Sequence, residues 1–332
     1  MRVTFKQSIK NIIFLTLSNN IRINKRIISL GESNTLTILN LHRVADDDGS
    51  GYKPLSPKLF EELVIFLKNN YIITSFRNIE KNDFNLNEAS EKPKIILSFD
   101  DGYKDFLTTA HPILIKNNIR ANQNIIPDCV VNSKPPLNVA LQDLIGKSSE
   151  DELDQLEIPG FKWNTNLSKK REGLRVSTYI KNKPRKIQLE LERYLKNQIG
   201  EKLYERATPM MSLKEIKSIF NYYDWGAHSY YHSNMEFESS SFFRADLISC
   251  KEWFKSKLNF NPHIYAFPNN SYRKELLNIA NTLGFSTLLA VNDEFSNLKA
   301  RIHSRFNFDA ISSIEIPFKA TGRNKKIFNN DK

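Results

Sequence analysis

The sequence predicts an α/β protein in which seven or eight βα repeats form a barrel with a mainly helical insertion. Two observations favour this fold. Short apolar, strand-like runs alternate with amphipathic helical segments, as in parallel βα units. Polar residues able to do chemistry follow several of these runs, and barrel active sites lie at the carboxyl ends of the strands. With 332 residues, of which 40% are hydrophobic and 26% charged, the chain is long enough for one barrel-sized domain.

The first half of the barrel is predicted from residue 36 onward. Leu36 to Leu41 reads as an apolar strand, and Ser56-Pro57 reads as the N-cap and first position of a helix whose apolar stripe runs to Leu67. A helix from Lys104 is expected to be interrupted at Pro112. The further strands expected here are residues 71–76, 94–99 and 121–126.

The alternation stops between residues 132 and 208 and then returns. Pro135-Pro136 and Pro159-Gly160 mark loops, and Arg185 to Ile199 reads as a polar amphipathic helix. We therefore predict an insertion, residues 132–210, folded over one end of the barrel. The βα alternation returns at Ser212 to Glu215, a capping-box sequence that predicts the start of a helix. Strands are then expected at 222–227, 263–267, 286–291 and 305–308, and helices at 243–258 and 272–283.

The two ends of the chain carry most of its net charge of +11. Residues 1–31 hold six basic and no acidic residues, and residues 319–332 hold five basic and one acidic residue. The body between them is nearly neutral, which does not favour a nucleic-acid-binding surface. We divide the chain into a basic amphipathic segment (1–35), the barrel (36–310) and a basic tail (311–332).

The amphipathic segment shows apolar residues at helical spacing from Phe5 to Leu17. It lacks the features of a secretory signal, and no stretch approaches the ~18–20 apolar residues that span a bilayer. We expect a cytoplasmic protein that makes peripheral contact with anionic lipid at the inner membrane face; packing of the segment on the barrel wall is the alternative. Cys129 and Cys250 form no disulfide framework, which fits a reducing compartment.

A metal site is indicated at the end of the strand 94–99. The strand runs directly into Asp100-Asp101-Gly102. Adjacent like charges repel unless something divides their roles, and a cation bound to one carboxylate leaves the other free as a base. A solvated Asp-Gly turn is the alternative for these residues alone.

A histidine pair supplies the missing ligands. His228 and His232 lie four residues apart, which on one helical turn would place both imidazoles on one face. With Asp101 they would form a two-histidine, one-aspartate set that leaves a position open for water, as in catalytic zinc sites.

Together, Ser98-Phe99-Asp100-Asp101-Gly102 and His228-Ser229-Tyr230-Tyr231-His232 resemble the first two motifs of the polysaccharide deacetylases, carbohydrate esterase family 4. The resemblance runs from about residue 36 to 308. It implies a distorted (β/α) barrel, Asp100 as general base, and Asp101, His228 and His232 as ligands of Zn²⁺ or another divalent metal such as Co²⁺, Ni²⁺ or Mn²⁺.

A third family motif has a counterpart in Tyr265 to Tyr272, which contains Pro268 and Asn269. Asn269 stands where the family usually has tyrosine, and the backbone N–H at this position is the implied oxyanion donor. We also assign Tyr103 to the residues expected to contact the substrate or the oxyanion, together with Pro268 and Asn269. No segment matches the family's Asp-x-x-Asp-Trp motif convincingly.

The general acid has two candidates. The resemblance is nearest to the circularly permuted branch that includes the bacterial poly-N-acetylglucosamine deacetylases, where a histidine ahead of the Asp-Asp motif takes this role; His42 fits that place. His303 lies where the usual C-terminal motif would fall. Arg305 is expected to be a surface cation, and a role in orienting Asp100 is the alternative.

The predicted activity is metal-dependent de-N-acetylation of an amino-sugar glycan or a glycan precursor, the latter lipid-linked or nucleotide-linked. The alternatives are a related amide hydrolase, such as a sugar deformylase or a small-molecule amidase, and a non-catalytic glycan-binding protein on the same fold.

Overall fold

The computed structural model describes residues 14, 16–33, 35–81, 92–154, 156–298 and 300–327. Its centre is a parallel sheet with the strand order β8-β7-β6-β5-β4-β3-β1-β9, in which β2 also pairs with β3. The strands are β1 (Leu36–Leu41), β2 (Ile72–Ile73), β3 (Lys94–Phe99), β4 (Asn122–Ile125), β5 (Asp224–Ala227), β6 (Ile264–Ala266), β7 (Thr287–Ala290), β8 (Ile302–Ser304) and β9 (Phe306–Asn307). This sheet confirms the predicted distorted (β/α) barrel.

The sheet closes on itself at Arg305. The strand β8 pairs with β7 at one end of the order, and β9 pairs with β1 at the other. Because only Arg305 separates β8 from β9, one bent segment joins both edges of the sheet. The predicted last strand, 305–308, is thus wrong in its bounds: it is replaced by two short strands on either side of this residue.

The side-chain alternation of the strands sorts residues between the two faces of the barrel wall. Leu39 and Leu97 belong to the large core that also includes residues of the helices. Leu36, Ile38 and Ile96 belong to a separate small apolar cluster. On the same face, Asn40 is the next residue after Ile38, and Ser98 is the next after Ile96. Both Asn40 and Ser98 are buried and polar. One end of the barrel interior is therefore apolar and the carboxyl end is polar.

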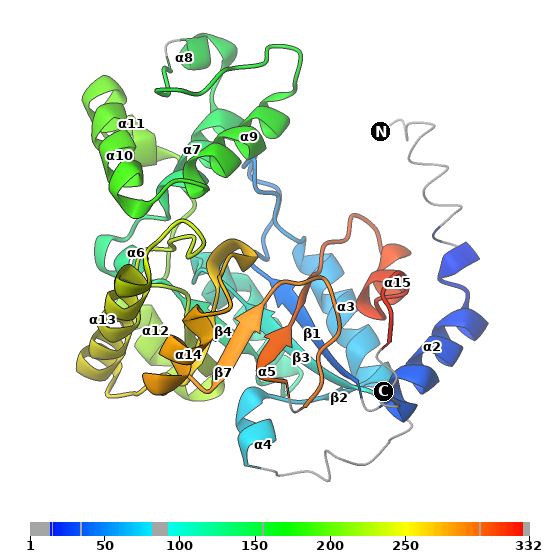
Figure 1. The fold of residues 1–332 in the computed structure, drawn as a ribbon. Coiled ribbons are helices and arrows are strands. Elements are labelled where there is room, and N and C mark those ends of the chain that lie inside the picture. Colours follow the sequence, from blue (N-terminus) through cyan, green and yellow to red (C-terminus); the bar gives the residue numbers. More distant parts are fainter. Residues whose placement is uncertain are drawn as a thin grey trace.

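Helices cover the outside of the barrel (Figure 1). The helix α3 begins as predicted, because Ser56 accepts a hydrogen bond from the N–H of Leu59 and Pro57 occupies the first turn. The other helices of this layer are α2 (Asn20–Glu32), α4 (Phe76–Glu80), α5 (His111–Lys116), α12 (Leu213–Ile219), α13 (Ser240–Leu258), α14 (Leu276–Thr282) and α15 (Glu315–Ala320), with α3 spanning Pro57–Asn70.

The stretch predicted as an insertion is helical. It contains α7 (Leu137–Lys147), α8 (Glu150–Asp154), α9 (Lys169–Lys181), α10 (Arg185–Ile199) and α11 (Lys202–Glu205), preceded by α6 (Pro127–Asn132). Helices α7 to α11, which we call the cap, lie together to one side of the barrel (Figure 1). The cap has its own apolar cluster, which includes Leu141, Ile145, Val176, Ile180 and Leu195.

Three predicted elements differ from the structure. The strand expected at 71–76 is reduced to β2, because Ser75 caps α4 by accepting a hydrogen bond from the N–H of Asn78. The helix expected from Tyr272 begins only at Leu276. The broken helix after Lys104 is a short π-helix, Phe106–Ala110, followed by α5 with Pro112 in its first turn.

The N-terminal prediction can be compared only in part. Most of the helix expected from Phe5 to Leu17 lies outside the described residues, while α2 follows it. Among the described residues, no helix combines the length and the apolar character needed to cross a membrane. Cys129 and Cys250 are buried free thiols, which confirms that they form no disulfide with each other.

Candidate metal centre and active site

The Asp-Asp motif lies where β3 leaves the barrel wall. All six residues of β3 are buried, and the N–H of Asp100 still continues the sheet by donating to the carbonyl of Leu41. The chain then turns sharply, with φ of 74° at Asp101 and 87° at Gly102, both in the left-handed region that glycine adopts without strain. This turn gives the two adjacent carboxylates different surroundings.

The histidine pair lies in a loop after β5, so the helical turn expected for His228 to His232 is wrong. Ser229 and His232 have φ near 60°, which curls the loop. Asp246 of α13 holds that curl: its carboxylate accepts from the Ser229 hydroxyl at 2.8 Å and from the Tyr230 N–H at 2.9 Å. Asp246 is a supporting residue that the sequence pattern did not indicate, because only the fold brings α13 to this loop.

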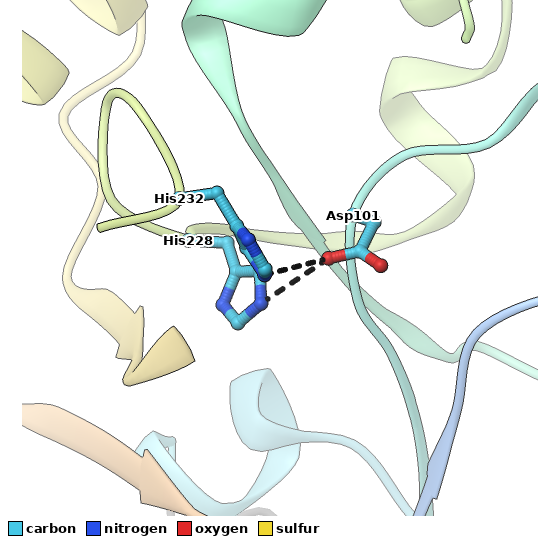
Figure 2. Close-up of side chains that lie close together, drawn as sticks. All are labelled: Asp101, His228 and His232. Carbon is cyan, nitrogen blue, oxygen red and sulfur yellow. Dashed lines mark ion pairs between the residues drawn. The ribbon is translucent and has the colours of Figure 1, made fainter. Parts of the chain in front are cut away.

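Asp101, His228 and His232 converge as predicted (Figure 2). Oδ1 of Asp101 lies 3.3 Å from Nε2 of His228 and 3.5 Å from Nε2 of His232. One possible ligand atom from each residue lies within 4.8 Å of the other two, and all three residues are buried. We call these residues the triad.

The triad fits a divalent cation by its chemistry as well as its spacing. Nδ1 of His228 lies 2.9 Å from the carbonyl oxygen of Ala266, so this nitrogen carries the proton and Nε2 presents a lone pair toward Asp101. Oδ1 of Asp101 is buried and has no hydrogen-bond partner among the described residues. An unsatisfied buried carboxylate oxygen is costly, and two imidazole nitrogens with one carboxylate oxygen are typical zinc ligands.

Asp100 faces a different set of partners. The guanidinium of Arg305 donates to both carboxylate oxygens, at 2.8 Å to Oδ1 and 2.9 Å to Oδ2. The amide of Asn124 donates to Oδ1 at 2.8 Å. Burial raises the pKa of Asp100 and Arg305 lowers it, and the net effect places it at about 2. Asp100 is therefore ionised at neutral pH.

Arg305 is fully buried, so its interpretation as a surface cation is wrong. Its position at the closure of the barrel aims the guanidinium across the interior to the end of β3. Asn124 was missed, although a signal existed: residues 122–124 put three consecutive polar side chains in a predicted strand. Such side chains are buried only where they find partners, and here Asn124 also exchanges hydrogen bonds with Asn122 and donates one to Ser98.

A pocket of about 390 Å³ opens beside these carboxylates. His42 lines it, with its ring edge-on to Tyr52 at 5.4 Å. Burial lowers the pKa of His42, while the charges of Asp101 and Asp100 act in the opposite direction. His303 does not line this pocket; its ring hydrogen-bonds to Ser296 at 3.0 Å and packs against Phe76.

The third motif forms part of the same pocket wall. Asn269 lines the pocket with φ of 56°, and its side-chain Nδ2 is buried with no hydrogen-bond partner among the described residues. The hydroxyl of Tyr103 is likewise buried with no hydrogen-bond partner in the described part of the chain, and Tyr103 also lines the pocket. Pro268 is buried and is not among the residues that line the cavity.

The opposite wall comes from the cap, which the sequence analysis did not assign residue by residue. Its polar lining residues are Asn138 and Gln142 of α7 and Ser177, Thr178 and Lys181 of α9. Because helix faces in an insertion depend on how its own core packs, no motif pointed to them. The pocket thus joins a barrel wall that carries the triad to a cap wall that carries amide, hydroxyl and ammonium groups.

The family model described as polysaccharide deacetylase matches residues 201–288, which include the histidine pair and the whole third motif but not Asp100 and Asp101. A comparison with curated proteins returned no match.

Several solved structures share the fold. The Streptococcus pyogenes deacetylase PplD, in complex with acetate, superposes with a TM-score of 0.57 at 17% identity over 86% of this chain and 98% of that one. IcaB from Ammonifex degensii gives a TM-score of 0.55 at 16% identity, covering 86% and 97% of the two chains. A de-N-acetylase from Aggregatibacter actinomycetemcomitans gives 0.53 at 13% identity, covering 83% and 96%.

The family-model match confirms the resemblance that the motifs predicted. The solved structures named deacetylases show in addition that this chain shares their fold over most of its length.

Proposed function

We propose that this chain is a metal-dependent de-N-acetylase of an amino-sugar glycan or a glycan precursor. The observation that carries the proposal is the convergence of the triad beside a second carboxylate, Asp100, which has its own partners in Arg305 and Asn124. Two adjacent carboxylates with separate partners can serve separate roles, one as ligand and one as base. The solved Streptococcus pyogenes deacetylase of the same fold holds acetate, the acid that this reaction would release.

The residues suited to hold the cation are Asp101, His228 and His232. A divalent cation, Zn²⁺ or in its place Co²⁺, Ni²⁺ or Mn²⁺, would supply Lewis-acid chemistry by making water more acidic and polarising an acyl oxygen. The Ala266 carbonyl fixes the tautomer of His228 for this task.

Asp100 is the proposed base, and Oδ2 is the atom suited to receive the proton. Oδ1 accepts hydrogen bonds from both Arg305 and Asn124, whereas Oδ2 accepts one, from Arg305. Oδ2 also lies 4.0 Å from Nε2 of His228, on the side of the triad. Water that loses its proton to Oδ2 would attack the acetyl carbonyl carbon.

His42 is the proposed acid for the departing nitrogen. When the carbon–nitrogen bond breaks, acetate leaves and the amine gains a proton from the imidazolium. Burial lowers the pKa of His42, which makes its protonated ring a stronger proton donor. The proposed partners of the acyl oxygen or the sugar are the N–H of Asn269, its side-chain amide and the Tyr103 hydroxyl. The last two are buried without a hydrogen-bond partner among the described residues, and both residues line the pocket.

The first test is acetate release from N-acetylated oligosaccharides and amino-sugar precursors, with zinc measured on the same preparation. We expect release that disappears with a chelator and returns with zinc. One zinc per chain without acetate from any substrate would redirect the proposal to a deformylase or amidase. Protein that binds no zinc and releases nothing would support a non-catalytic glycan-binding role.

Location is a second part of the proposal: α2 contacts an anionic membrane surface from the cytoplasmic side. Ile21 and Ile28 expose 67% and 50% of their surface on α2, and Arg22 and Lys25 are exposed beside them. Apolar and basic side chains on one helix suit the interface of an anionic bilayer. Sedimentation with phosphatidylglycerol vesicles should exceed that with phosphatidylcholine, and Lys25→Glu should reduce it. Equal sedimentation with both lipids would contradict this contact.

A further inference from the structure

The cap wall of the pocket is fixed against the barrel by buried polar contacts. The carboxylate of Asp143 on α7 accepts hydrogen bonds from the Ser50 hydroxyl and from the N–H of Thr208, the latter at 2.6 Å. Lys147 at the end of α7 pairs with Asp48 at 3.0 Å. Since α9 packs on α7 through the cap's apolar cluster, the residues of α9 that face the pocket hold a defined position relative to the triad.

Lys181, the last residue of α9, brings an ammonium group to this pocket. Among the described residues no carboxylate pairs with it. Burial lowers the pKa of Lys181, and its charge is one of those that lower the pKa of His232, so the ammonium lies within electrostatic reach of the triad. A half-buried cation without a counter-ion is costly, and a ligand that supplies the anion removes that cost.

The two carboxylates of the pocket lie against side chains other than Lys181. Asp100 is neutralised by the two hydrogen bonds from Arg305. Asp101 faces His228 and His232 and belongs to the triad. Neither carboxylate forms an ion pair with Lys181, so within the described part of the chain Lys181 contributes an unpaired positive charge to the cap side of the pocket.

A second hydrogen-bond donor accompanies the ammonium. Ser177 lies four residues before Lys181, on the same face of α9, and both line the pocket. The Ser177 oxygen accepts from the side-chain amide of Asn138 at 3.2 Å, which leaves the hydroxyl proton free to donate into the pocket. An ammonium and a hydroxyl on one wall are suited to a phosphoryl group, which lysine binds as a point charge.

We propose that Lys181 and Ser177 bind a phosphoryl group attached to the N-acetylated sugar, so that the substrate is a sugar phosphate rather than a neutral glycan chain. This inference rests on the proposed de-N-acetylation. The cavity of about 390 Å³ lies in the size range of small-molecule sites and has room for one sugar with its phosphate. The same chemistry serves a nucleotide-linked or a lipid-linked sugar.

Binding can be tested without catalysis. Calorimetry on the metal-free protein, which lacks the cation that the proposed reaction needs, should show binding of N-acetylglucosamine 1-phosphate about tenfold tighter than that of N-acetylglucosamine. Using metal-free protein keeps the triad's cation from holding the phosphate. Lys181→Gln should abolish the difference, and Lys181→Arg should keep most of it. Lys170→Gln, the same change at an exposed position of α9, serves as the control and should have no effect.

The kinetic test uses the zinc-loaded protein and four probes: N-acetylglucosamine 1-phosphate, its uridine diphosphate derivative, a polyprenyl diphosphate derivative and neutral chitobiose. Lys181→Gln should raise KM about tenfold for the phosphorylated probes and change their kcat little. For chitobiose, the same substitution should change neither KM nor kcat. Preference for the uridine or the polyprenyl probe would identify the source of the phosphate.

The two proposals fail in different ways. Equal use of charged and neutral probes, or equal loss for both in Lys181→Gln, would overturn the phosphate subsite while leaving de-N-acetylation intact. If no probe releases acetate, the proposed reaction fails, and calorimetry then still decides the phosphate subsite: retained tight binding that needs Lys181 supports it, and its absence overturns it.

Discussion

The barrel and the cap meet at one pocket but position their residues by different means. In the barrel, parallel pairing and the alternation of side chains fix which residues face the interior, so Asp100 and Arg305 meet through backbone register. In the cap, Ser177 and Lys181 reach the pocket because α9 packs on α7 around a separate apolar core. We therefore expect the barrel to supply the chemistry and the cap to select the substrate.

The sharpest test of the barrel's part is Asp100→Asn. We expect activity to fall by about 10²–10⁴-fold, because the amide cannot accept the proton from water, while zinc content stays at the wild-type level. Acetate release and metal analysis on one preparation give both readings. Asp309→Asn, the same change at an exposed carboxylate, is the control and should leave activity unchanged. Substantial activity in Asp100→Asn would remove this residue from the role of base.

The second test separates the two histidines proposed as acid. His42→Asn should lower kcat by about 10²-fold, since His42 lines the pocket. His303→Asn should leave kcat close to wild type and lower the free energy of unfolding by about 1 kcal/mol, because it disturbs the hydrogen bond to Ser296. Steady-state kinetics and thermal denaturation of both variants decide the point. The opposite pattern would assign the acid role to His303.

The smallest effect is expected from loosening the cap. In Asp143, one carboxylate oxygen accepts from Ser50 and the other from Thr208. Asp143→Asn replaces one of these oxygens by an NH2 group, which cannot accept a hydrogen bond, and should lower the free energy of unfolding by about 1–3 kcal/mol. We expect KM to rise a few-fold, kcat to stay within about twofold and zinc content to remain unchanged. Asp151→Asn on the exposed part of α8 is the matched control. A fall in kcat at constant KM would show that the cap takes part in the chemical step, and the division between the two regions would fail.

Much of the barrel could be predicted because its signals are local. The apolar run of β3 ends directly at Asp100-Asp101, and Ser56-Pro57 marks the start of α3. The histidine pair could be predicted as ligands from its spacing, but not the loop that presents it, since the left-handed residues there depend on hydrogen bonds to Asp246. Short strands such as β2 were overestimated because Ser75 caps a helix within the apolar run.

The sequence by itself determined the alternating βα pattern, the triad residues and the adjacent carboxylates, because each of these depends on near neighbours in the chain. Only the tertiary structure decided that Arg305 and Asn124 hold Asp100, that His42 and not His303 borders the pocket, and that Lys181 lines the same pocket as the triad. Arg305 lies more than 200 residues from Asp100 along the chain, and the closure of the sheet brings them together. Such contacts arise from strand register and helix packing, which no local pattern encodes.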